Sequence, residues 1–529
     1  FIDSSCHKHI IKEINGFDKW KLYEDFFFTK LERGSKEYND LIVAFWKDLL
    51  DITEKLGSYI ESNNITLLYL VNVCSNPGNV SLALATVLIS EYLGIPVINN
   101  NHDFYWDGGN KKIDIQTKGL KPGPRDFFFT NSHLGEFFSQ IEVLYPYESR
   151  SWMTVNINNN QSNHVIEING HNPANVCEIG TAVDTDRYTT LTKRKKINAF
   201  LQVQAILSNY KKKLIVSAID DVIKKRTIDK ASPDPILVGS KNALSFDFVG
   251  DNIVFLQPTR LMPRKRIEIG FKMISRLFEN EEFVAKFKSN PQLTLTFLIT
   301  GPIPLGQYSY FLKLLQSFSD LLKELKPAFR KRVFLGFLFS EFDKKRFKNR
   351  YNEPVDIPEL YNIASLIMLP SETEGRGLPI IEATACGIPI FCRRYYPENV
   401  YAEVIGGHLE ESDRLKVLEF DGIHITDKLI EQIINRVFFP QNYIDEVEHN
   451  KRAVQKRYSL ESLQANIIQI LHKLYLQLQP NKESFELTVR SLNQYKKTLS
   501  YKNTEVLIIT KNREYLPCFG RLSFMSFLK

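Results

Sequence analysis

Two glutamates separated by seven residues, Glu374 and Glu382, are the side chains of this sequence best suited to chemistry. Ionised carboxylates accept hydrogen bonds from hydroxyl groups. At this spacing, the two carboxylates contact different parts of one extended ligand. Both lie in the segment Pro370–Pro389, which also carries a Gly-x-Gly loop. We therefore expect this segment to bind a ligand.

The elements around this loop are predicted to be a strand and a helix. The apolar run that ends at Pro370 is typical of a buried strand, Gly375 and Gly377 make a tight loop, and a helix opens at Pro379 and stops at Gly387. The first amide groups of a helix have no internal partner and lie at the positive end of its dipole. The loop therefore offers backbone donors to a diphosphate or to sugar hydroxyls.

A second loop, farther upstream, carries two cations. The apolar run 252–257 leads into Arg260 and Lys265, five residues apart, and an amphipathic helix follows. This spacing lets both cations reach one diphosphate, because arginine gives a forked contact and lysine a point charge. The neighbouring Arg264 and Arg266 are interpreted as a solvated basic face.

Together the two loops resemble the motifs of glycosyltransferase family 4 (group 1), retaining enzymes of the GT-B fold. The segment 370–389 resembles the Glu-x7-Glu signature of that family. The cation loop looks like its Gly-Arg-Leu-x-x-x-Lys diphosphate site, with Thr259 where glycine is usual. The resemblance implies that Glu374, as a catalytic residue, contacts hydroxyls of the donor sugar and that Glu382 holds the nucleotide ribose.

The resemblance also implies a set of donor-binding residues. Arg376 departs from the family pattern, which often has an aromatic residue there, and is expected to alter donor choice. Gly336 ends a predicted strand, and the loop after it either lies against the nucleotide base or is a plain turn. The full donor-binding set is Arg260, Lys265, Gly375, Arg376, Gly377, Leu378, Glu382 and Gly336.

A third motif lies in the amino-terminal part, where two βα steps are predicted within residues 64–106. His102 and Asp103 follow a strand, at the sheet edge where open α/β sheets place ligands. They resemble the His-Asp pair that many family members direct into the interdomain cleft, and are expected to be catalytic. Tyr105 and Trp106 either stack on an acceptor sugar or pack in the core.

The predicted fold class is α/β, with two Rossmann-like, doubly wound domains that face a cleft and a carboxyl-terminal helix that crosses back, as in the GT-B fold. Residues 176–188 resemble the family's interdomain connector. The predicted parts are an amino-terminal, acceptor-side domain at 1–184 with a polar insertion or extended hairpin at 149–175, a nucleotide-sugar domain at 185–455, the crossing helix at 456–479 and a tail of unknown structure at 480–529.

The amino-terminal domain is expected to be incomplete. Family members usually start with a strand and a glycine-rich loop, whereas residues 1–64 offer a helix at 40–62 and no such loop. An open sheet edge invites association. We therefore expect this chain to bind a nucleotide through its second domain and to transfer sugar poorly.

Composition narrows the classes of function. The 529 residues are 43% hydrophobic and 24% charged, which excludes a disordered or fibrous chain. The six cysteines have no paired metal spacing, and neither a signal peptide nor a membrane span is recognisable, so a cytoplasmic protein is predicted. The net charge of +7 suits anionic substrates and peripheral membrane contact, and no nucleic-acid module is evident. The oligomeric state stays open.

The function predicted from these features is transfer of a sugar from a nucleotide diphosphate to a hydroxyl of an unidentified acceptor, with retention of anomeric configuration. No cofactor or divalent metal is expected, because the cations serve the leaving group and no Asp-x-Asp pair lies at these loops. The alternatives are another GT-B enzyme, a sugar-nucleotide epimerase or a phosphorylase, and a catalytically silent binding protein.

Overall fold

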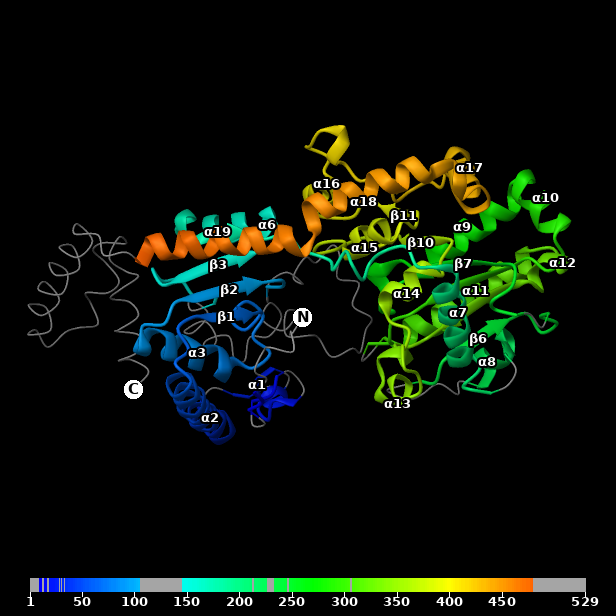
Figure 1. The fold of residues 1–529 in the computed structure, drawn as a ribbon. Helices are drawn as coiled ribbons and strands as arrows, with labels where there is room; N and C mark the ends of the chain where they lie inside the picture. Colours follow the sequence, from blue (N-terminus) through cyan, green and yellow to red (C-terminus); the bar gives the residue numbers. More distant parts are fainter. Residues whose placement is uncertain are drawn as a thin grey trace, which may run out of the picture. The chain divides into compact units, whose positions relative to one another are not determined.

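The computed structural model describes residues 9–11, 14–16, 19–27, 29, 31–32, 34–104, 145–211, 214–225, 233–244, 247–304 and 307–478 (Figure 1). These residues form two compact units. Unit 1 contains the described residues up to Ile179 together with those from Ala465 onward, and unit 2 contains Gly180–Gln464. Each unit is built on its own sheet.

The sheet of unit 1 has four parallel strands in the order β1-β2-β3-β4. All five residues of β2 and of β3 are buried, whereas β1 lies at one edge and alternates between half-buried and exposed residues. The elements of unit 1 are α1 (Tyr23–Phe27), α2 (Lys36–Ser62), β1 (Leu68–Val71), α3 (Val80–Leu93), β2 (Val97–Asn101), β3 (Trp152–Asn156), α6 (Asn159–Glu167), η2 (Pro173–Asn175), β4 (Val176–Glu178) and most of α19 (Leu460–Leu478).

Helices α2 and α3 form the main core of unit 1 together with β2 and β3. Asn79 caps α3 by accepting a hydrogen bond from the amide of Leu82, and Gly94 ends the helix in the left-handed conformation. Trp152 in β3 is fully buried and donates its indole N–H to Ser90 Oγ at 3.0 Å. The predicted helix at 40–62 and the predicted βα step into β2 are thereby confirmed.

The sheet of unit 2 has eight strands in the order β12-β11-β10-β7-β8-β9-β6-β5. Six of them are parallel, and β6 pairs with β9 in the antiparallel direction. Its strands are β5 (Val216–Ala218), β6 (Ile236–Gly239), β7 (Asn252–Gln257), β8 (Thr294–Ile299), β9 (Val333–Phe337), β10 (Leu366–Leu369), β11 (Ile390–Arg393) and β12 (Leu418–Phe420).

Helices cover both faces of this sheet, because its strand residues alternate between two hydrophobic cores. Phe255 in β7 faces the core formed with α9, α10, α11 and α17, whereas Val254 and Leu256 face the core formed with α7, α14, α15, α16 and α18. The helices of unit 2 are α7 (Lys193–Leu207), α8 (Ile219–Lys225), η3 (Pro263–Lys265), α9 (Glu268–Glu279), α10 (Glu281–Ser289), α11 (Tyr308–Glu324), α12 (Pro327–Arg330), η4 (Glu341–Asp343), α13 (Lys345–Lys348), α14 (Ile357–Asn362), α15 (Leu378–Cys386), α16 (Glu398–Ile405), η5 (Glu411–Asp413), α17 (Asp427–Phe438), η6 (Pro440–Tyr443) and α18 (Ile444–Tyr458). The predicted α/β class with two Rossmann-like units is confirmed.

Two predicted features differ from the structure. The stretch 149–175 is neither an insertion nor a hairpin, because it supplies the buried strand β3 and helix α6 to unit 1. Its polar residues misled the prediction: several cap α6 or bond within the core. The predicted crossing helix is also divided, since α18 ends at Tyr458 and α19 begins at Leu460 after Ser459. The tail at 480–529 lies outside the described residues.

Candidate active site

The cation loop joins β7 to α9. Gln257 is fully buried at the end of β7 and donates its amide to the carbonyl of Lys265 at 2.9 Å, which fixes the far side of the loop. Arg260 is exposed. Arg266 has a left-handed backbone, with φ of +47°, a conformation that non-glycine residues rarely adopt. The hydrogen bond from Gln257 therefore fixes the end of the loop, whereas the side chain of Arg260 faces solvent.

The glutamate loop joins β10 to α15, as predicted. Gly377 precedes α15 with φ of +65°, and Gly387 follows the helix in the same conformation. A β-carbon at Gly377 would lie 3.0 Å from Tyr395 Cε1, so only glycine fits. Gly375 and Leu378 flank this position and are exposed.

Lys265 and Glu374 connect the two loops. The lysine Nζ lies 2.5 Å from Glu374 Oε1, and the two side chains are 12% and 10% exposed. Arg264 adds a second link, because it donates to the carbonyl of Thr373 at 2.8 Å. The two motifs that were predicted to bind one ligand are thus neighbours in unit 2.

Lys265 and Glu374 each shift the pKa of the other. Burial acts to raise the pKa of Glu374, but the nearby cations Lys265 and Arg264 and the hydrogen bond from Lys265 together hold it below its usual value. Burial lowers the pKa of Lys265, and Glu374 acts against this shift. Glu374 is therefore an ionised hydrogen-bond acceptor at neutral pH.

The interpretation of Arg264 and Arg266 as a solvated basic face is wrong. Both are only partly exposed, and Arg266 contacts Glu268 at 3.0 Å and Glu372 at 2.9 Å. Glu372 belongs to the glutamate loop, so Arg266 is a third link between the loops. The sequence did not reveal this, because the two residues are more than one hundred positions apart.

Glu382 lies in α15 and is bonded to two tyrosines. Tyr188 Oη donates to its Oε1 at 2.9 Å, and Tyr361 Oη donates to its Oε2 at 2.7 Å. Burial raises the pKa of Glu382, and the two hydroxyl groups act in the opposite direction. Neither tyrosine was predicted to belong to the site, although Tyr188 is the last residue of the predicted connector.

Gly301 is a further residue of the site that the sequence analysis did not single out. A β-carbon there would lie 2.6 Å from the backbone carbon of Thr259 and 2.7 Å from Arg260 Cα. The turn after β8 therefore packs directly against the backbone of the cation loop. The Gly301-Pro302 pair shortly after the apolar run of β8 is the sequence feature that marks this turn.

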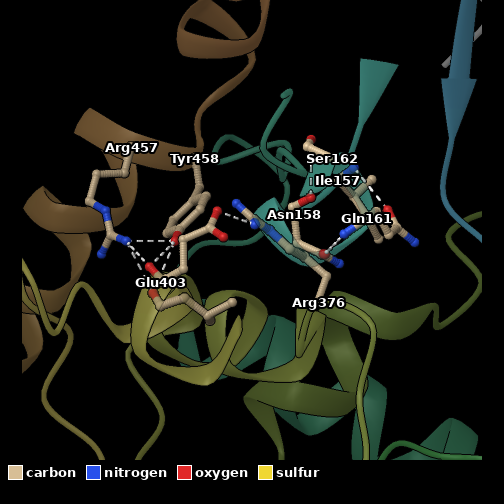
Figure 2. Close-up of polar contacts among 9 residues, drawn as sticks. Ile157, Asn158, Gln161, Ser162, Arg376, Glu403, Arg457 and Tyr458 are labelled. Carbon is tan, nitrogen blue, oxygen red and sulfur yellow. Dashed lines mark hydrogen bonds and ion pairs between the residues drawn. The ribbon is translucent and has the colours of Figure 1, made fainter. Parts of the chain in front are cut away.

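Arg376 has a carboxylate partner within unit 2. Its guanidinium forms an ion pair with Glu403 of α16, and its side chain is 7% exposed (Figure 2). Arg457 also contacts Glu403, because its guanidinium donates to the backbone carbonyl of that residue at 2.6 Å. The Arg457 Cζ atom lies 4.7 Å from the centroid of the Tyr458 ring. The positive charge of Arg376 is thus balanced by the Glu403 carboxylate. The influence of Arg376 on donor choice stays a prediction.

Gly336 is the last but one residue of β9, so the predicted strand is present and ends one residue later than expected, at Phe337. A β-carbon there would lie 2.9 Å from Leu298 Cδ1, so the missing side chain leaves room for core packing. The base-binding role of Gly336 stays a prediction, and its surroundings favour a structural role.

In unit 1, His102 and Asp103 follow β2, as predicted. Their backbone amides both donate to Asn72 Oδ1, at 2.7 and 3.1 Å, and Gln161 donates to the carbonyl of His102 at 3.1 Å. Gln161 is itself held in α6, where its amide bonds to Asn158 Oδ1 at 3.0 Å (Figure 2). The loop after β2 is thus fixed by two amide side chains.

The imidazole of His102 is exposed, but neighbouring protein atoms lower its pKa by partial desolvation, and the Asp103 carboxylate acts in the opposite direction. His102 is therefore mostly neutral at pH 7. Its catalytic role and that of Asp103 stay predictions. Tyr105 and Trp106 lie outside the described residues.

Neither a metal-binding cluster nor a membrane-spanning helix occurs among the described residues. No group of three or more His, Cys, Asp or Glu side chains is arranged to hold a metal ion there. Within the same part of the chain, no helix is both long and apolar enough to span a membrane. Independence of metals stays a prediction.

Comparison with known proteins relates one segment of unit 2 to a family. Residues 343–408 match the model of the glycosyl transferases group 1. This segment contains Glu374 and Glu382, but not Arg260 or Lys265. The mannosylglucosylglycerate synthase of Thermotoga maritima is 27% identical over 220 residues, which are 40% of this chain and 47% of that protein. The chain thus spans about half the length of this curated relative.

Solved structures that match this chain include HepE of Anabaena in complex with UDP, at 14% identity and a TM-score of 0.44 over 80% of this chain and 82% of that chain. A glycosyltransferase from Rickettsia africae has 14% identity and a TM-score of 0.45 over 81% and 82% of the two chains. The family match and the curated relative thus show that part of this chain is similar to glycosyltransferases of group 1.

Proposed function

We propose that this chain transfers a sugar from a nucleotide diphosphate sugar to an acceptor hydroxyl, with retention of anomeric configuration, as a member of glycosyltransferase family 4. The observation that carries the proposal is the ion pair of Lys265 and Glu374, which unites the cation loop and the glutamate loop at 2.5 Å. An anion-binding group and a hydroxyl acceptor thereby lie side by side.

The chemical barrier in such a transfer is charge separation, because the diphosphate leaves with negative charge while the anomeric carbon becomes positive. Arg260 and the first amides of α15 would stabilise the leaving group. The ammonium of Lys265 has three donors, so it can keep Glu374 and still bond to a phosphate oxygen. This set of cations needs no divalent metal.

The two glutamates have separate roles in this proposal. Glu374, ionised beside Lys265, accepts hydrogen bonds from hydroxyls of the donor sugar. Glu382, four residues into α15, accepts hydrogen bonds from the nucleotide ribose. His102, mostly neutral at pH 7, and Asp103 keep in this proposal the catalytic roles that the family resemblance implies.

Product analysis tests the proposal. The chain is first screened by thermal shift against UDP, GDP and ADP, and the corresponding nucleotide sugar is then incubated with candidate acceptors. We expect a nucleoside diphosphate and a new glycoside with the anomeric configuration of the donor. An isomerised nucleotide sugar would instead indicate an epimerase, a sugar phosphate would indicate a phosphorylase, and binding without any product would indicate a silent binding protein.

A matched pair of variants assigns the activity to the site. Glu374→Gln keeps the shape of the side chain and should lose turnover, whereas Glu419→Gln, a carboxylate of β12 outside the two loops, should keep it. Equal activity of these two variants would contradict the assignment.

A further inference from the structure

Tyr188 lies in the segment that leads from β4 into α7. From Gly180 onward this segment belongs to unit 2 and is fixed at several points by contacts within that unit. The amide of Val183 bonds to the carbonyl of Tyr458 at 2.8 Å, and Leu191 donates to Asn362 Oδ1 at 2.9 Å. Between these points, Arg187 forms an ion pair with Asp356 at 2.9 Å. The position of the Tyr188 side chain is therefore determined by the backbone on both sides.

The Glu382 carboxylate receives one tyrosine hydroxyl on each oxygen, Tyr188 on Oε1 at 2.9 Å and Tyr361 on Oε2 at 2.7 Å. The two rings meet edge to face with their centroids 6.3 Å apart. An ionised carboxylate has about four acceptor positions, so one position on each oxygen is left for another donor. Two neighbouring free positions match a pair of hydroxyl groups on adjacent carbons.

We propose that Tyr188 is a positioning residue for Glu382: with Tyr361, it holds the carboxylate in one orientation and in its ionised form, as the acceptor of two ribose hydroxyls. This inference rests on the proposed function, because it takes Glu382 as a nucleotide-binding group. The hydroxyl of Tyr188 is thus the part of the connector that acts on nucleotide affinity.

Electrostatics support this reading. Burial disfavours the charged form of Glu382 and raises its pKa, and the two tyrosine hydroxyls are the groups that lower it. The pKa of Tyr188 is itself raised by burial and by Glu382, so its hydroxyl remains a donor at every pH of interest. The other ionisable groups that interact with Tyr188 are Arg187, Asp356 and Cys386, and Cys386 in turn interacts with Glu359, Lys196 and Lys451.

The test compares Tyr188→Phe with the wild type, using the full chain and the nucleoside diphosphate selected from UDP, GDP and ADP. Dissociation constants are measured by calorimetry from pH 5.5 to pH 8, and the ratio of variant to wild type is taken at each pH, which cancels the titration of the phosphate. We expect a ratio of roughly three to ten at pH 8, because the carboxylate loses one of the two hydrogen bonds that orient it. The ratio should rise further toward pH 5.5, because Glu382 without Tyr188 protonates more readily. A ratio of one at pH 8, or a ratio that does not rise toward pH 5.5, would overturn the proposal.

Two controls separate the possible failures. Tyr401→Phe removes another hydroxyl bonded to a carboxylate, Glu419 at 2.9 Å, and should leave the ratio at one throughout. Glu382→Gln should weaken binding at pH 8. If Glu382→Gln binds like the wild type, the proposed nucleotide site is wrong. If it binds weakly while Tyr188→Phe shows a constant ratio, only the role of Tyr188 is wrong. Melting temperatures of all variants verify that they are folded.

Discussion

Lys265 and Glu374 form an ion pair across two loops that lie 109 positions apart in the chain. Both side chains are almost fully buried, at 12% and 10% exposure. A buried charge that loses its partner destabilises a fold strongly. This pair therefore holds the two loops together as well as offering groups to a ligand, which separates Lys265 from its exposed neighbour Arg260.

The first prediction follows from this difference. Arg260→Ala should change the free energy of unfolding by less than about 0.5 kcal/mol, because the side chain is exposed. It should weaken the binding of a nucleoside diphosphate by about 1.5–3 kcal/mol, the usual contribution of a hydrogen bond to a charged group. Urea unfolding and calorimetry measure the two quantities. Arg276→Ala in α9, another partly exposed arginine, is the control and should bind normally.

The second prediction concerns Lys265→Ala, which leaves Glu374 buried without its partner. We expect it to destabilise unit 2 by about 3–5 kcal/mol in urea unfolding, in addition to weakening nucleotide binding. Lys265→Ala would then differ from Arg260→Ala, which should leave the fold intact. Equal stabilities of the two variants would contradict the structural role of the ion pair.

The third prediction separates the two glutamates. Glu374→Gln should lower turnover far more than it lowers affinity for the nucleoside diphosphate, which lacks the sugar that Glu374 contacts. Glu382→Gln should weaken the binding of the nucleoside diphosphate itself. Steady-state kinetics and calorimetry on both variants test this division, and similar behaviour of the two would show that it is wrong.

The fourth prediction concerns Gly301→Ala. Its new methyl group would lie 2.7 Å from Arg260 Cα, so the backbone of the cation loop must shift. We expect a loss of about 1–3 kcal/mol in the free energy of unfolding and weaker binding of nucleoside diphosphates. Gly407→Ala, where the nearest atom would be 3.4 Å away, is the control and should bind normally.

The fifth prediction is a dependence of stability on pH. The pKa of Glu374 in the folded chain lies below its usual value, because its cationic partners outweigh the effect of burial. The unfolded chain therefore binds the proton first on acidification, at pH of about 4.3. The stability that Glu374 contributes is complete above that pH and is lost as the pH falls through its folded pKa.

Urea unfolding between pH 3 and pH 7 measures this contribution. Below pH of about 4.3 the wild type should lose free energy of unfolding more steeply than Glu374→Gln, which cannot titrate at this position. Parallel curves for the two proteins would contradict the lowered pKa.

The sequence predicted the local elements of the site well, because each has a local cause. The apolar run before Pro370 forms β10, and the cation loop follows β7. Gly377 and Gly387 take left-handed conformations at the two ends of α15. The same reasoning failed at 149–175, where asparagine and glutamine were interpreted as signs of a surface insertion. In the structure, Asn158 and Gln161 are buried and bond to backbone amides.

Contacts between distant segments were not predictable from local patterns. Arg266 and Arg264 were expected to be solvated, yet they contact the glutamate loop. Tyr188 and Tyr361 have no feature in sequence that pairs them with Glu382. Such contacts depend on which strands are neighbours in the sheet, and β7 and β10 are neighbours despite the intervening β8 and β9.

A crystal structure of the intact chain with a bound nucleoside diphosphate would show whether the cation loop and the glutamate loop together form the donor site. We expect the diphosphate within hydrogen-bond distance of Arg260 and Lys265, near the first amides of α15, and the ribose hydroxyls on the Glu382 carboxylate. A nucleotide bound elsewhere, with Arg260 and Glu382 free of contact, would contradict this expectation.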